Sequence, residues 1–184
     1  MNCDYLLITK KDFEGYVKIR ESCDYGTLSQ FILEAQDNDL QRVLGNAFMV
    51  DLFDALQGSD EVKAALYAPV MDGGLFTNCV DETMSSKGVK RALVHYAYAA
   101  YVMDGSYIDS VHGLVQKIND NSIPVPLGEL KNLHDRHVRI ASNYIQTVKD
   151  YLCANISLFP LYKGDCGGDL NRKVRGSTIT YLER

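Results

Sequence analysis

Two histidines and an aspartate lie close together near residue 135, at His134, Asp135 and His137. Imidazole and carboxylate groups bind metal ions and transfer protons, so these residues are the most suggestive of chemistry in the sequence. His134 and His137 are three residues apart, which puts both on one side of a helix, where they could share a metal ion. The candidates for a third ligand are distant in sequence: His95, His112 and Asp150. Because no third ligand has a fixed spacing and Arg136 and Arg139 add positive charge, we expect solvated or core histidines, with no metal, cofactor or catalytic site.

The cysteines and glycines do not form any other familiar site. Five cysteines without a CxxC pair argue against a disulfide framework or a zinc ribbon and favour a reducing compartment. We expect Cys153 and Cys166 to be small buried or free thiols. The glycines at 73–74 and 164–168 do not follow the order of a phosphate-binding loop, so turns explain them better.

Length and composition narrow the class of protein. A chain of 184 residues can bury one good core, and its 46% hydrophobic and 23% charged residues are ordinary for a globular domain. Its formal charge of −5 has the wrong sign for a protein whose main function is to bind the phosphates of nucleic acid. The longest apolar run, at 92–103, is shorter than the roughly 20 residues that cross a bilayer. The first residues lack the basic and apolar regions of a secretion signal, so we expect no membrane partner.

The stretch at 87–104 is the element around which we expect the chain to fold. Apolar or small residues occupy nearly every position after Arg91, and a helix that is apolar on all sides belongs inside a bundle. Val89, Leu93 and Tyr96 recur at the three- and four-residue steps of one helical face. Alanines on the other sides let neighbouring helices approach.

Apolar spacing predicts three helical segments between residue 27 and Gly58. The first is capped by Thr27 or Ser29 and ends at a break and new cap at 37–39. A short helix follows and stops or kinks at Gly45. A longer helix then continues to Gly58.

Two excursions interrupt the later helices. After a shorter helix over 62–67, the residues at 72–74 predict a turn that joins short strands, around 75–80. Residues 111–118 are typical of an exposed strand followed by a turn. A last long helix then runs to about Ala154 with a buried apolar stripe.

These elements predict a mainly α fold, a compact helical bundle of about four to five helices with a small β-hairpin or strand excursion and extended N- and C-terminal arms. The arms would occupy 1–25 and 155–184, and the helical domain 26–154, with excursions at 69–86 and 105–126. The C-terminal arm is glycine-rich and locally basic, so it cannot build a core of its own. It can dock on an acidic neighbour, lie near nucleic acid or remain a solvated terminus.

From about residue 28 onward, several short runs resemble the head-to-tail connector proteins of tailed bacteriophages, also called head-completion or neck adaptor proteins. The variant that is most similar is that of crAss-like and other phages of Bacteroides-like hosts. The runs are FILEAQDNDLQRVLGNAFMVDL at 31–52, GVKRALVHYAYAAYV at 88–102, HGLVQKINDNSIPVP at 112–126 and SLFPLYKGDC at 157–166. Their order and spacing carry the likeness, and the first 25 and last 18 residues show no such pattern.

The resemblance implies a non-enzymatic structural protein that forms a ring, most often of twelve copies, between the portal protein and the tail or further neck proteins. Such a ring joins the DNA-filled capsid to the tail in the neck of the virion, after synthesis in the host cytoplasm. DNA would pass through its channel without sequence-specific binding. The net negative charge is compatible with this passage, because few phosphates would be neutralised. We then expect acidic side chains to face the channel.

Two segments fit the contacts that such a ring needs. Identical subunits close a ring when one patch meets a different patch on the next copy. Residues 113–117 offer an exposed strand edge to a neighbour's backbone, and residues 159–162 offer an apolar plug on an arm. The candidate interface residues are Gly113, Leu114, Val115, Gln116, Lys117, Phe159, Pro160, Leu161, Tyr162 and Lys163.

Two other functions remain open. A His-Asp pair on a helix is similar to the motif of helical metal-dependent phosphohydrolases, and such an enzyme would use His134 and Asp135. A small cytoplasmic interaction module would have neither a bound metal nor a large assembly. We favour the ring because periodicity and composition provide no site that catalysis would need.

Overall fold

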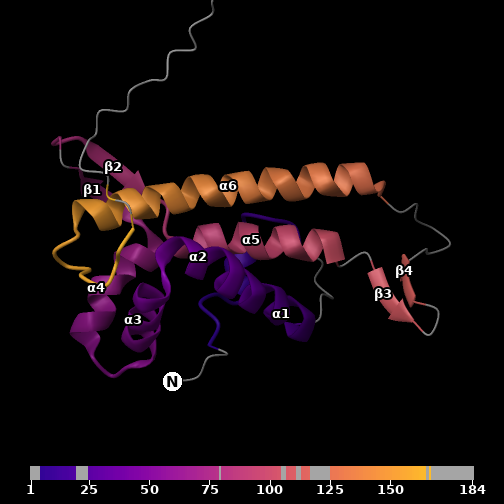
Figure 1. Cartoon of the computed structure of the whole chain (residues 1–184), viewed down its shortest axis with the longest axis horizontal. Coiled ribbons are helices and arrows are strands. Elements are labelled where there is room, and N and C mark those ends of the chain that lie inside the picture. Colours follow the sequence, from indigo (N-terminus) through magenta and orange to yellow (C-terminus); the bar gives the residue numbers. More distant parts are fainter. Residues whose placement is uncertain are drawn as a thin grey trace, which may run out of the picture.

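The computed structural model describes residues 5–19, 25–78, 80–104, 107–110, 113–116, 125–164 and 166. In chain order the elements are η1 (Lys10–Phe13), α1 (Tyr25–Ala35), η2 (Gln36–Leu40), α2 (Gln41–Leu44), α3 (Asn46–Gln57), α4 (Glu61–Asp72), β1 (Gly74–Thr77), β2 (Thr83–Ser86), α5 (Val89–Asp104), β3 (Tyr107–Ser110), β4 (Gly113–Gln116) and α6 (Leu127–Ala154). The predicted mainly helical bundle with a small β excursion is confirmed (Figure 1).

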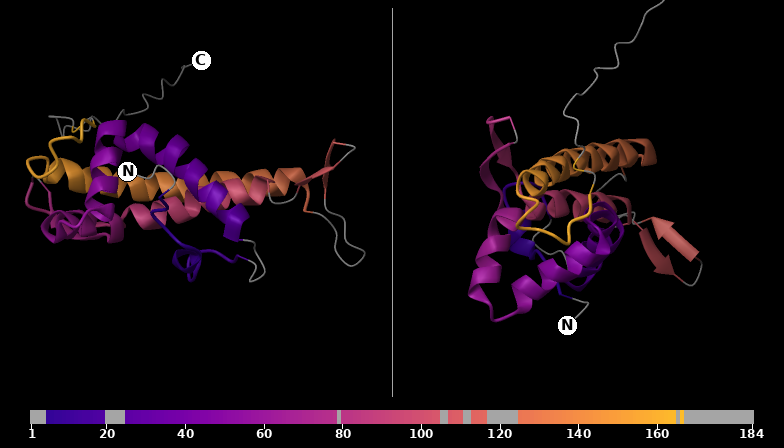
Figure 2. Two further views of the ribbon diagram at one scale, coloured as in Figure 1. Left: turned by 90° about the horizontal axis from the view of Figure 1, so that it is seen from below. Right: turned by 60° about the vertical axis from the view of Figure 1, so that its left-hand side comes forward.

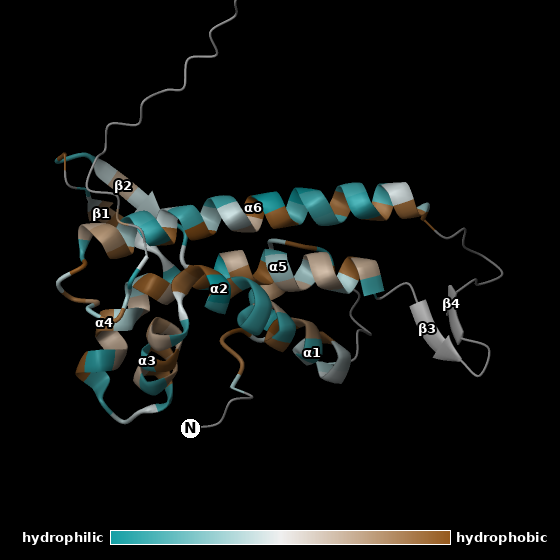
Figure 3. Cartoon of the chain, viewed as in Figure 1, coloured by the Kyte–Doolittle hydropathy of each residue, from teal (hydrophilic) through white to brown (hydrophobic). Residues whose placement is uncertain are grey.

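Helices α5 and α6 pack side by side in opposite directions and form the axis of the bundle (Figure 1). The buried residues of α5 lie on all its sides: Val89, Ala92, Leu93, Val94, His95, Tyr96, Ala97 and Ala99. α6 buries a single stripe, made by Leu130, Ala141, Ile145, Val148 and Leu152. Figure 3 shows mostly hydrophilic residues along the rest of α6. Burying one aliphatic side chain contributes about 1.5–3 kcal/mol, so this apolar seam is a major source of stability.

The helices before α5 cover its other side. α1 packs against α5 (Figure 2). At this contact the rings of Phe31 and Tyr101 meet edge to face, with centroids 6.0 Å apart. Gly45 has a φ of 87°, which lets the chain break between α2 and α3 as predicted. Asp60 caps α4 by accepting the N–H groups of Val62 and Lys63. Among the described residues, none of the helices combines the length and apolar character needed to cross a bilayer.

The helix predicted to end before residue 37 in fact continues. α1 already includes both predicted cap residues, Thr27 and Ser29, within its first turns. The break and new cap predicted at 37–39 are wrong, because the chain passes from α1 into α2 through the π-helical turn η2. Gln36 and Leu40 are both buried in that turn, so tertiary packing holds residues that by themselves favour a helix end.

The helix predicted over 62–67 is also longer than expected. α4 contains Pro69 and continues to Asp72. Proline removes one helical hydrogen bond, but Val70 and Met71 directly after it are buried in the core. Burial of these two side chains offsets the lost bond and keeps the last turn helical.

The first excursion is an antiparallel hairpin that lies against α6 (Figure 1). Its turn falls at 78–82, between β1 and β2, and the turn predicted at 72–74 instead leads from α4 into β1. Gly73 and Gly88 cross at the base of the hairpin with positive φ, and a Cβ on Gly73 would lie 2.5 Å from the Ser86 carbonyl oxygen. Only glycine fits such a close backbone approach.

The second excursion, described by its backbone, is also an antiparallel hairpin. β3 pairs with β4 from Tyr107 opposite Gln116 to Ser110 opposite Gly113. The predicted strand at 111–118 is therefore found as β4, and the sequence did not signal β3. The hairpin stands beyond the C-terminal end of α5, away from the bundle (Figures 1 and 2).

The described part of the N-terminal arm is fastened to the bundle by Gln36. The Leu7 N–H donates to Gln36 Oε1 at 2.8 Å, and Gln36 Nε2 donates to the Tyr5 carbonyl oxygen at 3.0 Å. Leu7, Ile8 and Phe13 are buried in the core. The arm is thus an extended strap with an apolar anchor and a two-bond polar clamp.

The segment after α6 folds back onto the core. Phe159 and Tyr162 are buried, and both rings meet that of Phe48, with centroids 6.2 and 5.6 Å away. This corrects the prediction that residues 159–162 form a plug for a partner, because two of the four side chains fill the chain's own core. Pro160 and Leu161, which lie between these two buried residues, are exposed because the chain follows tight turns after α6.

Cys153 and Cys166 form a disulfide, which corrects the prediction that they are small buried or free thiols. Cys153 lies in the last turn of α6, and the folded-back segment returns Cys166 to within 5.2 Å between Cα atoms. The pairing is hidden in the sequence by the twelve residues between the two cysteines, because the burial of Phe159 and Tyr162 brings the ends together. Three further cysteines lie outside the described residues: Cys3, Cys23 and Cys79.

Replacing Gln36 with alanine should lower the free energy of unfolding by about 1–3 kcal/mol, because the Leu7 N–H and the Tyr5 carbonyl would lose their partner in a buried setting. Urea unfolding followed by circular dichroism measures the loss. The matched control is Gln41→Ala, which removes only an exposed bond to Asn46 and should change stability by less than about 0.5 kcal/mol. Equal losses in the two variants would contradict the clamp.

Candidate functional site

A pair of histidines joins α5 and α6. His95 and His137 approach to 2.8 Å between their Nδ1 atoms, and their rings stack with centroids 5.1 Å apart. The rings of Tyr98 and Tyr144 stand beside the pair. His95 is buried, whereas His137 is half-buried at the edge of the seam.

The surroundings favour neutral imidazoles. Burial lowers the pKa of His95 to about 4, and the neighbouring His137 adds to the effect. Burial also lowers the pKa of His137, with a smaller contribution from the positive charge of Arg136. At neutral pH one imidazole therefore carries its proton on Nδ1, and this N–H donates a hydrogen bond to the unprotonated Nδ1 of the other imidazole. The pair satisfies two polar groups in the seam without a buried charge.

His134 and His137, whose spacing would allow them to share a metal ion, point in different directions. His134 Nδ1 contacts Asp135 Oδ1 at 2.9 Å on the exposed side of α6, while His137 turns inward to His95. Of the distant candidate ligands, Asp150 accepts a bond from Gln146, and His112 lies outside the described residues. In the part of the chain that the structure describes, no three ligating side chains converge.

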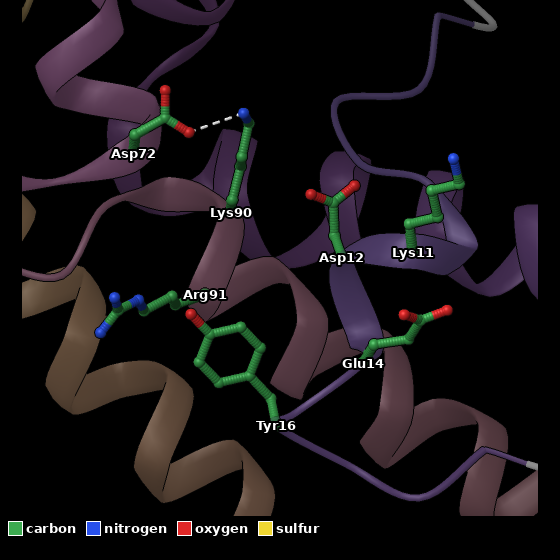
Figure 4. Close-up of a pocket in the computed structure, with 7 residues that line it drawn as sticks. All are labelled: Lys11, Asp12, Glu14, Tyr16, Asp72, Lys90 and Arg91. Atoms are coloured by element: carbon green, nitrogen blue, oxygen red, sulfur yellow. Dashed lines mark hydrogen bonds and ion pairs between the residues drawn. The ribbon is translucent and has the colours of Figure 1, made fainter.

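A charged hollow of about 370 Å³ separates the N-terminal strap from the start of α5 (Figure 4). Its lining residues are Lys11, Asp12, Glu14, Tyr16, Asp72, Lys90 and Arg91. Lys90 pairs with Asp72 at 2.6 Å, and Arg91 lies over the Tyr16 ring at 5.4 Å. Asp12 accepts the backbone N–H of Thr9 at 2.7 Å. The ion pair of Lys90 and Asp72 therefore joins the start of α5 to the end of α4 at one wall of the hollow.

A second polar group links α3 and α4. Lys63 lies 2.7 Å from a carboxylate oxygen of both Asp51 and Asp54, and the Tyr67 hydroxyl donates to Asp51. Burial alone would raise the pKa of Asp51, but the bonds from Lys63 and Tyr67 outweigh it and lower that pKa. Burial also raises the pKa of Tyr67. Sequence reasoning missed this group, although the i, i+4 spacing of Lys63 and Tyr67 on α4 was a signal for it.

The predicted interface residues of the C-terminal segment divide into two sets. Phe159 and Tyr162 are buried, whereas Pro160, Leu161 and Lys163 are exposed. Leu161 and Lys163 line an open hollow of about 340 Å³, whose other wall is the kink between α2 and α3 at 42–47. The buried neighbours therefore fix the backbone positions of the exposed residues.

Further apolar side chains are exposed in the same segment. Ile156, Leu158 and Leu161 are exposed by 43%, 50% and 42% respectively. They lie within six residues of one another in the segment that the disulfide closes, and we call them the exposed aliphatic stretch. Sequence reasoning placed only Leu161 among the interface residues.

The other predicted interface segment coincides with β4. Gly113, Leu114, Val115 and Gln116 form the strand, and Lys117 lies outside the described residues. β4 pairs with β3 on one side, and in the described part of the chain no other strand joins it. Its second edge is open to a strand from elsewhere.

A family model described as a family of unknown function (DUF6712) matches residues 40–172. The match runs from the end of η2 through both hairpins and α6 to a point beyond the disulfide. No curated protein matches the chain, and no solved structure matches it either.

Acid should destabilise the protein through His95. In the unfolded chain His95 titrates near 6.5 and in the folded chain near 4, so between these values the unfolded state binds more protons. Stability should fall as the pH is lowered from 6.5 and level off near 4, with a loss of at most about 3 kcal/mol from this residue. Urea unfolding at several pH values measures the effect.

The carboxylates also titrate in this range, so the informative quantity is the difference between the protein and its His95→Phe variant. That variant should show the shallower pH dependence, while Gln41→Ala, which alters a side chain that does not titrate, should follow the unaltered protein. Identical pH profiles for the protein and His95→Phe would show that the histidine pair does not titrate as described.

Proposed function

The chain belongs to a family of unknown function (DUF6712), and we propose that it is a structural subunit of a ring, of about twelve copies by family resemblance, at the head-to-tail junction of a tailed bacteriophage. The ring would lie in the neck of the virion between the portal protein and the tail or further neck proteins. DNA would pass through its channel without sequence-specific binding. Three features of the structure support this role, besides the resemblance of the four sequence runs.

The main support is the detached hairpin of β3 and β4. It stands beyond the end of α5, and its two strands pair with each other and with no other described strand (Figure 1). Unpaired backbone N–H and C=O groups along a strand edge are a template for a strand of another chain. A hairpin that stands away from the bundle and has two open strand edges is suited to contact between subunits.

The second support is the exposed aliphatic stretch after α6. Ile156, Leu158 and Leu161 leave apolar surface in water, and the buried Phe159 and the disulfide hold this stretch in one conformation. The centre of a protein interface is typically apolar, and a preorganised patch loses little entropy on binding. This stretch can therefore form the core of a contact.

The third support is that many polar side chains in the described residues bond to one another within the chain. The histidine pair satisfies its members internally, as does the group around Lys63, and Lys90 pairs with Asp72 in the charged hollow. The alternative function, a phosphohydrolase that uses His134 and Asp135, has less support. His137 contacts His95 on α5, so it does not join His134 and Asp135 in a common site. The interactions seen inside the chain stabilise a rigid unit, which is the requirement for a building block.

The test is the size of the assembly, measured by native mass spectrometry and electron microscopy of the purified chain, alone and with its portal protein. The chain should form a closed ring. Replacing residues 107–116 with a glycine-serine linker of equal length should abolish the ring and leave the helical circular dichroism intact. The matched control is Val62→Ser, at a side chain 81% exposed on α4, which should leave the ring unchanged.

Two results would count against this role. A chain that stays a monomer of 20.6 kDa both alone and with the portal protein would overturn the proposed ring. A ring that persists without the hairpin would keep the role but remove the hairpin as its main contact.

A further inference from the structure

The outer edge of β1 is a second unpaired strand edge, at the other end of the bundle. β1 pairs with β2, and β2 lies against α6, where the Lys87 N–H donates to Thr147 Oγ1 at 3.0 Å. The inner face of the sheet is closed by the Phe76 ring, which meets Tyr151 edge to face at 5.5 Å. Among the described residues no backbone group outside the hairpin bonds to β1.

The outer face of this edge is apolar. Leu75, in the middle of β1, is 77% exposed, and Val80 in the following turn is 57% exposed. Natural edge strands usually carry charges or prolines that prevent pairing, and β1 has neither. An open edge with an exposed leucine is thus built to accept a further strand.

The chain carries a matching strand sequence in its C-terminal segment. Residues 177–182 read STITYL, a run of strand-favouring residues in which Ile179 and Tyr181 alternate with Thr178 and Thr180. Such a run cannot form a sheet alone and needs an existing edge. Ten residues at 167–176 connect it to Cys166, and this connection spans at most about 35 Å.

Charge complements the strand pairing. The connection carries Arg172, Lys173 and Arg175 directly before the strand run. The turn that follows β1 carries Asp81 and Glu82, both exposed. If the run lies antiparallel to β1, its first residue is next to the end of β1, which brings the basic residues beside these two carboxylates.

We infer that residues 177–182 of one copy add as a third strand, antiparallel to β1, on the outer edge of β1 in a neighbouring copy. The inference rests on the proposed ring, because a ring needs on each subunit a donor and an acceptor that differ. The C-terminal run is the donor and the β1 edge is the acceptor. The covered surface would include Leu75, and the new backbone bonds would close the open edge.

The direct test places a photo-crosslinking amino acid, benzoylphenylalanine, at position 75 of the full chain. Irradiation followed by peptide mapping should find the cross-link within residues 177–182. Rings assembled from mixed nitrogen-14 and nitrogen-15 chains should give cross-linked peptides that contain both isotopes, which shows that donor and acceptor are different copies. The same probe at Val62, equally exposed but on a helix, should not cross-link to this segment.

A second variant tests the strand itself. Thr180→Pro removes a backbone N–H and prevents pairing, so it should abolish the cross-link and dissociate the ring to single chains. Thr180→Val preserves strand propensity and should retain both. Neither variant alters the described core, so the thermal unfolding of the helices should not change.

The outcomes separate this inference from the proposed ring. Rings that form without the cross-link, or that survive Thr180→Pro, overturn the added strand and leave the ring intact. Cross-links that contain one isotope only show that the strand folds back within its own chain, which also overturns the inference. A chain that never forms a ring, alone or with the portal protein, overturns both proposals.

Discussion

The contact between α5 and α6 is the constraint on which the rest of the structure depends. α5 is apolar on all sides, so it is stable only when every side is covered, and α6 supplies the longest cover. The one strongly polar residue that α5 buries, His95, is tolerated because it stays neutral and finds His137 on α6. Without that partner a buried imidazole would lose its hydrogen bond with water and gain nothing in return.

The two chain ends are fixed to this seam by different means, and both leave a free portion. The side chain of Gln36 holds the N-terminal strap by hydrogen bonds to the backbone of the strap. Phe159 and the disulfide hold the C-terminal segment. These anchors use residues that would otherwise be available to a partner, Phe159 and Tyr162 among them. Exposed residues beside the anchors, such as Leu161, are held in position. They would therefore lose less conformational entropy when they bind a partner.

The features that were predictable from the sequence are those that depend on neighbours in the chain. The all-apolar central helix, the stripe of α6, the break at Gly45 and the start of α4 after Asp60 all follow from local spacing. The continuation of α4 through Pro69 was not predictable, because its cause is burial against distant helices.

The same limit applies to the candidate site. The histidine pair joins residues 42 positions apart, and their approach depends on how two helices align. The spacing of His134 and His137 suggested a shared metal, but the helical face of His137 is set by the seam and not by its neighbour. The disulfide was hidden for a related reason, since two buried aromatic rings bring its ends together. In contrast, β4 was found, because strand composition is a local signal.

The positions of the two hairpins also limit the kind of assembly. The β1–β2 hairpin lies near the C-terminal end of α6 and the β3–β4 hairpin beyond its N-terminal end (Figure 1). A helix of 28 residues is about 42 Å long, so the two open edges are too far apart to belong to one patch. A single self-complementary patch would favour a closed dimer with two-fold symmetry, whereas two separate edges each require a different partner surface. Contacts of that kind propagate from copy to copy, and they end only when the rotation between neighbours closes the series into a ring.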